Sequence, residues 1–257
     1  MGTVGGNAME PLSRTSKELE KFADALRDIA DGSSIAFGGF AAVGVPFNLI
    51  GALVKQGARG LTIVTNGLGS GQVPRPPDSN MLVENGQVRK AICAFTAATR
   101  ASDVLPFTKF YEAGEVEGEL VPQGTLAERL RAAGAGIPAF YTPAAVGTEL
   151  AEGRETRVFN GREYLLEHAL PVDYAFLRAW RADAFGNLQF RRSQRNFNPL
   201  MAMAARTAIV EVEEPILPVG EIDPDHVHLS GIFVHRLVHI PPPPEGIWPT
   251  RRPERRR

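Results

Sequence analysis

Apolar residues recur in two rhythms along this chain, and the alternation of these rhythms predicts its secondary structure. Short, nearly continuous apolar runs predict buried strands at 34–40, 61–65, 90–95, 119–121, 174–180 and 207–212. Apolar positions at helical spacing predict helices at 15–30, 46–56, 102–113, 126–133 and 198–205. Buried strands separated by helices favour a parallel sheet that is covered on both faces. We therefore expect an α/β fold with a mostly parallel sheet flanked by helices.

Local signals mark several element ends. Thr15 and Glu18 have the spacing of a capping box and would open the first helix. Pro46 suits the first turn of the second helix, because its missing N–H would be unpaired there, and Gly57 ends that helix. Later in the chain, Asn160-Gly161 separates two apolar segments. This pair accommodates the positive φ angles of a tight turn, so it predicts a β-hairpin.

The composition is that of a globular protein, with 44% hydrophobic and 22% charged residues. The net charge of −1 gives no global field toward nucleic acid or an anionic membrane, so we expect neither as a partner. We expect one domain at 13–240, a disordered N-terminus at 1–12 and a disordered, Pro/Arg-rich tail at 241–257. No apolar run approaches the ~20 residues of a membrane span, and no signal-peptide pattern opens the chain. A cytoplasmic location is the resulting expectation.

The single cysteine, Cys93, lies in an apolar run and excludes an intramolecular disulfide. We expect it to be a buried structural thiol, because no neighbour would lower its pKa. The five histidines are not accompanied by a cysteine or carboxylate cluster. We therefore expect no metal site.

The segment most suggestive of chemistry is 31–46, which delivers a strand into a glycine turn before a helix. Gly38 and Gly39 lack a Cβ, so a ligand can approach the backbone closely. The helix after Pro46 begins with unpaired N–H groups that could face an anion. The residues alone therefore predict a phosphate or carboxylate ligand, with a simple tight turn as the alternative.

As a whole, segment 31–46 resembles the signature of the α subunit of family I CoA-transferases. That signature consists of Asp-Gly, apolar residues, Gly-Gly-Phe and Gly-x-Pro. Further segments resemble the same family at 61–66, 119–129, 134–143, 195–199 and 211–214, so that the resemblance spans 17–240. The resemblance implies a CoA-transferase fold and an active site between this chain and a β-type subunit, in a heterodimer or an α₂β₂ assembly.

The resemblance also implies site residues. Gln123 matches a glutamine whose side-chain amide is an oxyanion-hole donor, whereas the nucleophilic glutamate belongs to the partner subunit. Substrate or CoA contacts are expected from Gly38, Gly39, Phe40, Gly44, Asn66, Arg195 and Asn196, and Asn198 is a possible further contact or helix cap. This chain does contain Glu84-Asn85-Gly86, which matches part of the nucleophile motif. Because Asn-Gly after an apolar pair is typical of a turn, we interpret Glu84 as a turn residue.

The implied reaction moves CoA from succinyl-CoA or acetyl-CoA to a short-chain 3-oxo acid such as acetoacetate or 3-oxoadipate. It is a ping-pong exchange through a glutamyl-CoA thioester, with CoA as a substrate and no cofactor. Two departures concern the acceptor side of the site: a Pro-rich stretch at 73–77, and Gln194 where alanine is frequent. Two alternatives stay open, a CoA-ester hydrolase on the same scaffold and a ligand-sensing domain of a transcription regulator.

Overall fold

The computed structural model describes residues 16–69, 77–97 and 104–240. Three predictions therefore lie outside the described residues: the disordered N-terminus at 1–12, the disordered tail at 241–257, and most of the Pro-rich loop at 73–77. Thr15 also lies outside, so the predicted capping box is not tested.

An eight-stranded sheet forms the centre of the described chain, and every neighbouring pair in it is parallel. The strand order is β1-β13-β12-β9-β2-β3-β4-β5. These strands are β1 (Glu18–Leu19), β2 (Ser34–Phe37), β3 (Leu61–Gly67), β4 (Val88–Phe95), β5 (Glu117–Leu120), β9 (Val172–Ala179), β12 (Ala205–Val212) and β13 (Arg236–His239). The predicted α/β class with a mostly parallel sheet is confirmed.

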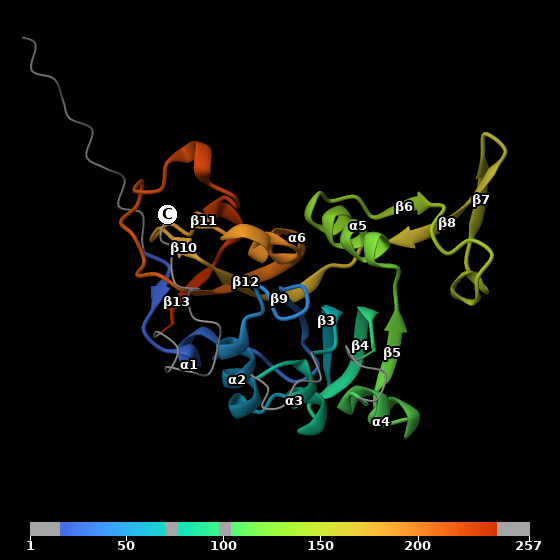
Figure 1. Ribbon diagram of the computed structural model, residues 1–257, viewed down its shortest axis with the longest axis horizontal. Helices are drawn as coiled ribbons and strands as arrows, with labels where there is room; N and C mark the ends of the chain where they lie inside the picture. The colour runs from blue at the N-terminus through green and yellow to red at the C-terminus, as the bar shows by residue number, and fades with distance from the viewer. Residues whose placement is uncertain (1–15, 70–76, 98–103, 241–257) are drawn as a thin grey trace, which may run out of the picture.

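Helices cover both faces of this sheet (Figure 1). The lower face in that view carries α1 (Phe22–Ala25), α2 (Phe47–Gln56), α3 (Ser79–Glu84) and α4 (Pro106–Glu112). The upper face carries α5 (Gln123–Gly134) and α6 (Asn198–Ala204). Alternate side chains of one strand enter different cores: Ile35 and Phe37 pack with α2, whereas Ala36 faces the core that contains α5 and α6. Burial on both faces explains the continuous apolar runs in the sequence.

The prediction of one long helix at 15–30 is wrong. Glu18 and Leu19 form the edge strand β1, which pairs with β13, and only Phe22–Ala25 is α-helical before a series of turns. Backbone pairing with a sheet edge here outweighs a local helical periodicity, because intrinsic helix propensity is a weak preference that tertiary contacts override. By contrast, Pro46 and Gly57 bound α2 as predicted, and Gly57 takes the left-handed conformation with φ 88°.

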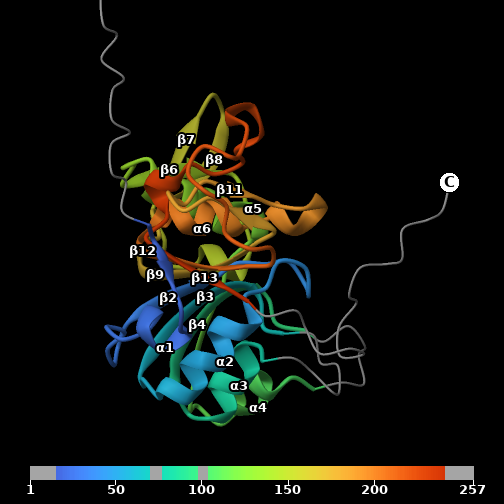
Figure 2. The ribbon, with the colours of Figure 1, turned by 90° about the vertical axis from the view of Figure 1, so that its left-hand side faces the viewer.

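Smaller elements surround the central sheet. The predicted hairpin is confirmed as β7 (Thr156–Phe159) and β8 (Arg162–His168), with φ 50° at Asn160 and φ 75° at Gly161. With β6 (Ala139–Thr142) these strands form a three-stranded antiparallel sheet that projects to the right of Figure 1. Figure 2 shows α5 and α6 stacked above the central sheet and α1 to α4 below it. The pair β10 (Arg181–Ala182) and β11 (Leu188–Gln189) forms a short hairpin.

Three further features concern the helix α3, the single cysteine and the length of the helices. The helix α3 was not predicted, since the sequence was interpreted there as loop and turn. Cys93 is buried in β4 as expected, and burial raises the pKa of its thiol to about 11. In the described part of the chain, no helix has the length and apolar character that would let it cross a bilayer.

Candidate active site

The carboxyl end of β2 leads into a tight loop that precedes α2. Phe40 and Val43 exchange two backbone hydrogen bonds of 3.0 Å, and Ala41 between them has φ 50°. The backbone N–H of Gly38 donates to the carbonyl of Phe176 on β9 at 2.9 Å. The loop is therefore fixed at the edge of the sheet where the parallel strands end, which is the usual place for ligands in open α/β sheets.

Glycine is required in this loop because other groups approach its backbone too closely for a side chain. A Cβ added to Gly38 would lie 2.0 Å from Oδ1 of Asn198. At Gly39, where φ is 118°, it would lie 2.4 Å from Cγ2 of Val45. At Gly44, with φ 74°, it would lie 2.7 Å from the carbonyl oxygen of Gln194. Gly38 and Gly44 allow the loop to pack on α6 and on the segment before it, whereas Gly39 allows the loop to pack on its own Val45.

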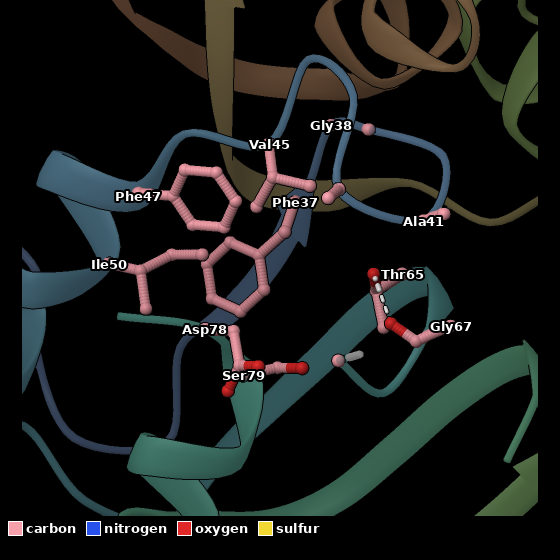
Figure 3. Close-up of a pocket in the computed structure, with 13 residues that line it drawn as sticks. Phe37, Gly38, Ala41, Val45, Phe47, Ile50, Thr65, Gly67, Asp78 and Ser79 are labelled. Atoms are coloured by element: carbon pink, nitrogen blue, oxygen red, sulfur yellow. Dashed lines mark hydrogen bonds between the residues drawn. The ribbon is translucent and has the colours of Figure 1, made fainter. Parts of the chain in front are cut away.

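A narrow cleft of about 30 Å³ opens beside this loop. Figure 3 shows Phe37, Val45, Phe47 and Ile50 on one side of it and Thr65, Gly67, Asp78 and Ser79 on the other. Gly38 and Gly39 line the cleft, together with Ala41, Ala42 and Gly69. Phe40 lies outside this lining and has a side chain that is 47% exposed, so it is placed at the rim. The cleft thus has an apolar wall from β2 and α2 and a more polar wall from β3 and α3.

Two of the site residues that the family resemblance implies contact each other at the same edge. Gln123 is the first residue of α5, and its Nε2 donates a 2.7 Å hydrogen bond to Oδ1 of Asn66 near the end of β3. Asn66 is buried, whereas Gln123 is exposed. Each amide group has N–H groups beyond those used in this bond. The structure therefore presents a fixed side-chain amide next to the strands that form the cleft.

The segment before α6 contacts the glycine loop. The Nδ2 group of Asn196 donates to the carbonyl of Val43 at 2.9 Å, and Nδ2 of Asn198 donates to the carbonyl of Gly44 at 3.2 Å. Both asparagines thus hold loop carbonyls rather than cap a helix with the side chain. Arg195 is exposed and contacts the carbonyl of His228 at 3.4 Å, away from these loop contacts.

The sequence predicts a phosphate or carboxylate ligand, or else a simple tight turn, at the start of α2, and in the structure a carboxylate of the chain itself contacts the N–H groups there. The carboxylate of Glu211, on β12, accepts the backbone N–H groups of Asn48 at 2.9 Å and Leu49 at 3.0 Å. It also accepts the side-chain amide of Asn48 at 3.2 Å. The physical reason for a carboxylate at this position was correct, because free N–H groups and the helix dipole favour a negative charge. The sequence could not show that this carboxylate comes from the same chain.

A buried polar network continues from Glu211. Arg178 on β9 contacts Glu211 through Nη1 at 3.1 Å and Glu213 through Nε at 2.8 Å. The side chain of Gln194 donates to Glu213 at 3.0 Å and accepts the N–H of Arg191. Gln194 was expected to shape the acceptor side of the site because it replaces a frequent alanine. The structure places it inside this network, where it is buried.

Glu84 is the last residue of α3, just before the turn at Asn85-Gly86 and the amino end of β4. This position is at the edge of the sheet opposite to the glycine loop. Among the described residues, no group of three or more histidine, cysteine, aspartate or glutamate side chains could hold a metal ion. The cleft residues on β3 and α3 were not predicted, although Thr65 stands next to Asn66 at the end of an apolar run and carried that signal.

Comparisons with known proteins show which proteins this chain is similar to. Residues 19–239 match the family model described as coenzyme A transferase. The chain is 47% identical over 225 residues to the A-type subunit of 3-oxoadipate CoA-transferase from Pseudomonas putida, covering 88% of this chain and 94% of that protein. It is 50% identical over 215 residues to the A-type subunit of succinyl-CoA:3-ketoacid coenzyme A transferase from Xanthomonas campestris pv. campestris strain B100, covering 82% and 83% of the two chains.

Solved structures show the same fold. Glutaconate coenzyme A-transferase from Acidaminococcus fermentans has a TM-score of 0.76 at 25% identity and is matched over 88% of this chain and 76% of its own. The acyl-CoA transferase YdiF of Escherichia coli O157:H7 has a TM-score of 0.76 at 20% identity over 90% of this chain. The present chain spans about half of that protein, 48% of its length.

Proposed function

Because the chain belongs to the coenzyme A transferase family, we propose that it is the A-type subunit of an enzyme that moves CoA from succinyl-CoA or acetyl-CoA to a short-chain 3-oxo acid. Acetoacetate and 3-oxoadipate are the acceptors proposed first, since relatives are named for 3-ketoacids and for 3-oxoadipate. The proposal includes a B-type partner subunit in a heterodimer or an α₂β₂ assembly, and it keeps the cytoplasmic location expected from the sequence.

The observation that carries this proposal is the identity of 47% and 50% to two A-type subunits across more than four fifths of each chain. The site geometry supports it. A polar amide, an apolar cleft and a glycine loop lie at the ends of neighbouring strands, whereas Glu84 lies at the opposite edge. Within the described residues, the cleft lining includes one carboxylate, that of Asp78, and no glutamate. The nucleophilic glutamate is therefore proposed to come from the partner.

The proposed reaction has paired steps. The partner's glutamate carboxylate attacks the thioester carbonyl, the C–S bond breaks, and CoA leaves as a thiolate, so that the glutamate and the acyl group form a mixed anhydride. The thiolate then attacks the glutamyl carbonyl, which releases the first acid and leaves an enzyme–CoA thioester. The acceptor carboxylate repeats both steps in reverse order, so no external oxidant, reductant or cofactor is required. A carboxylate is a weak nucleophile, so the reaction depends on stabilising the tetrahedral oxyanion at each attack.

Gln123 is proposed to supply that stabilisation. One N–H of its amide is used by Asn66, which fixes the side chain, and the other N–H is available to an oxyanion. A donor that is oriented before the reaction does not have to reorganise when charge develops. The apolar wall of the cleft is proposed to contact the acyl chain, and the binding energy of the long CoA tail can support the chemistry at the thioester.

The test is a CoA-transfer assay from succinyl-CoA to acetoacetate and to 3-oxoadipate. It is run with this chain alone and with the chain co-expressed with a B-type partner. Transfer in the mixture only, with a radiolabel or mass increment of CoA trapped on the partner, supports the proposal. Transfer by the chain alone that disappears in Glu84→Gln would refute the assignment of the nucleophile. Release of free CoA without an acceptor would instead favour the hydrolase alternative.

A further inference from the structure

Glu211 is a fully buried carboxylate with an exposed fraction of 0%, and the proposed chemistry does not use it. Burial prevents it from reaching a thioester, so it cannot act as a nucleophile. Its partners are instead the first turn of α2 and Arg178. A buried charge is expensive unless it is paired and hydrogen-bonded, so its presence here calls for a physical role.

The first turn of α2 is a wall of the cleft. Phe47 and Ile50 line the cleft from this turn, on either side of Asn48 and Leu49, whose N–H groups the carboxylate accepts. The glycine loop runs directly into the same turn. Because two backbone groups and one side chain converge on one carboxylate, a small shift of Glu211 would move the apolar wall and the end of the loop together.

Arg178 contacts the Glu211 carboxylate and connects it to further polar groups. Arg178 bridges Glu211 and Glu213, and the backbone N–H of Arg178 donates to Oδ1 of Asn198 at 3.1 Å. Asn198 in turn donates to the carbonyl of Gly44. The carboxyl-terminal part of the glycine loop is therefore connected to Glu211 by two routes, one through α2 and one through Asn198 and Arg178.

We propose that Glu211 is a positioning residue of the acyl site, whose carboxylate fixes the first turn of α2 and thereby sets the width of the cleft. This inference rests on the proposed function insofar as the cleft is taken to bind the acyl chain. Glu211 acts through Asn48 and Leu49 and is not a catalytic residue.

The role has a pH signature. Burial raises the pKa of Glu211 to about 7, against the opposing effects of Arg178 and of the hydrogen bonds from Leu49 and Asn48. The charged groups of its network are Arg178 on β9 and Glu213 after β12, while α2 and α6 contribute the neutral Asn48 and Asn198. Protonation removes the negative charge that the start of α2 favours, so the KM for the acyl substrate should rise as pH falls through about 7.

The test uses Glu211→Gln in the chain co-expressed with its partner, with Glu221→Gln as the matched control at an exposed position. Loss of a helix cap corresponds to a change of about tenfold in an equilibrium. We expect the KM of Glu211→Gln to rise about tenfold with kcat reduced less than about threefold, and its KM to become independent of pH between 6 and 8. The control should keep the wild-type KM and its pH profile.

Amide hydrogen exchange gives a second readout that does not require activity. In Glu211→Gln, exchange in 38–50 should accelerate while exchange in β3 stays at the wild-type rate. Asn48→Ala removes one exposed side-chain donor to the carboxylate. It should accelerate exchange in 38–50 by less than Glu211→Gln does. If Glu211→Gln does not fold, the exchange of Asn48→Ala decides whether the carboxylate fixes the first turn of α2. An unchanged KM profile and unchanged exchange would overturn the inference. An inactive wild-type complex would refute the proposed function, and the exchange data would still decide the role of Glu211.

Discussion

Replacing Gln123 by alanine should lower kcat of CoA transfer by about 10² to 10³, because one oriented oxyanion donor contributes about 2.7–4 kcal/mol. Gln123 is exposed in the single chain, so the full effect requires that the partner subunit and the substrate exclude water from its amide. Gln123 is the first residue of a helix, and its amide is already fixed by the 2.7 Å bond to the buried Asn66. The substrate KM should change little, since the interaction is proposed to form in the transition state.

The partner substitution tests whether the orientation of the amide matters. Asn66→Ala removes the acceptor of the Gln123 amide but leaves its second N–H intact. The freed side chain regains rotational freedom with an entropic cost of ordering of up to ~1.5–2 kcal/mol, so kcat should fall about tenfold. If Asn66 acts through Gln123, the double variant should be no slower than Gln123→Ala alone, because the two losses are not independent.

The assay is initial-rate CoA transfer in the complex with the B-type partner, with succinyl-CoA and acetoacetate both varied. Gln189→Ala is the matched control, since Gln189 lies on the short hairpin and its side-chain amide donates to the backbone carbonyl of His226. Circular dichroism and unfolding midpoints verify that each variant is folded. A double variant whose loss equals the product of the single losses would refute the coupling of Asn66 to Gln123. A Gln123→Ala enzyme with wild-type kcat would refute the role of the amide itself.

Three further predictions concern stability and reactivity. Gly39→Ala should lower the free energy of unfolding by more than about 2 kcal/mol, since φ is 118° and the new Cβ would lie 2.4 Å from a neighbouring side chain. Gly124→Ala, with nothing within 4 Å, should be neutral or stabilising by up to about 1 kcal/mol in the same urea titration; equal effects would contradict the steric argument. Burial lowers the pKa of His235, whose Nδ1 accepts the N–H of Ala208 at 3.0 Å. The stabilisation by neutral His235 should be complete above about pH 6.5 and decrease as pH falls below it. If the urea midpoint of His235→Gln decreases with falling pH as much as that of the wild type, His235 does not make this contribution. Cys93, whose pKa burial raises to about 11, should resist a thiol–disulfide exchange reagent at pH 8 until the protein is unfolded; rapid labelling of the native protein would show that the thiol is accessible.

Much of the fold could be predicted, because a strand that is buried on both faces of the sheet appears in the sequence as a continuous apolar run. The strands β2, β3, β4, β9 and β12 all coincide with apolar runs in the sequence. Where tertiary pairing competes with local pattern, prediction failed. The edge strand β1 lies in a segment with helical periodicity, and α3 follows a stretch whose prolines suggested only loop.

The candidate site divides in the same way. The residue types were recognisable one by one. Gly38 and Asn66 stand at strand ends, where a bare backbone or a side chain can meet a ligand, and Gln123 was identified by the family resemblance. Their mutual contacts were not. The sequence predicted an anionic ligand or a simple tight turn at the start of α2, and the structure places there the carboxylate of Glu211, which is 163 residues away along the chain.

By itself, the sequence determined the alternation of strands and helices, the parallel sheet and the glycine turn, because periodicity and positive φ are local requirements of the chain. Only the tertiary structure decided that Gln123 donates to Asn66, that Asn198 holds the loop at Gly44, and that Glu211 occupies the start of α2. Each of these contacts joins segments that are far apart along the chain, separated by 57, 154 and 163 residues respectively. The order in which strands pack side by side brings such segments together, and hydrogen bonds between them have no counterpart in any local pattern of residues.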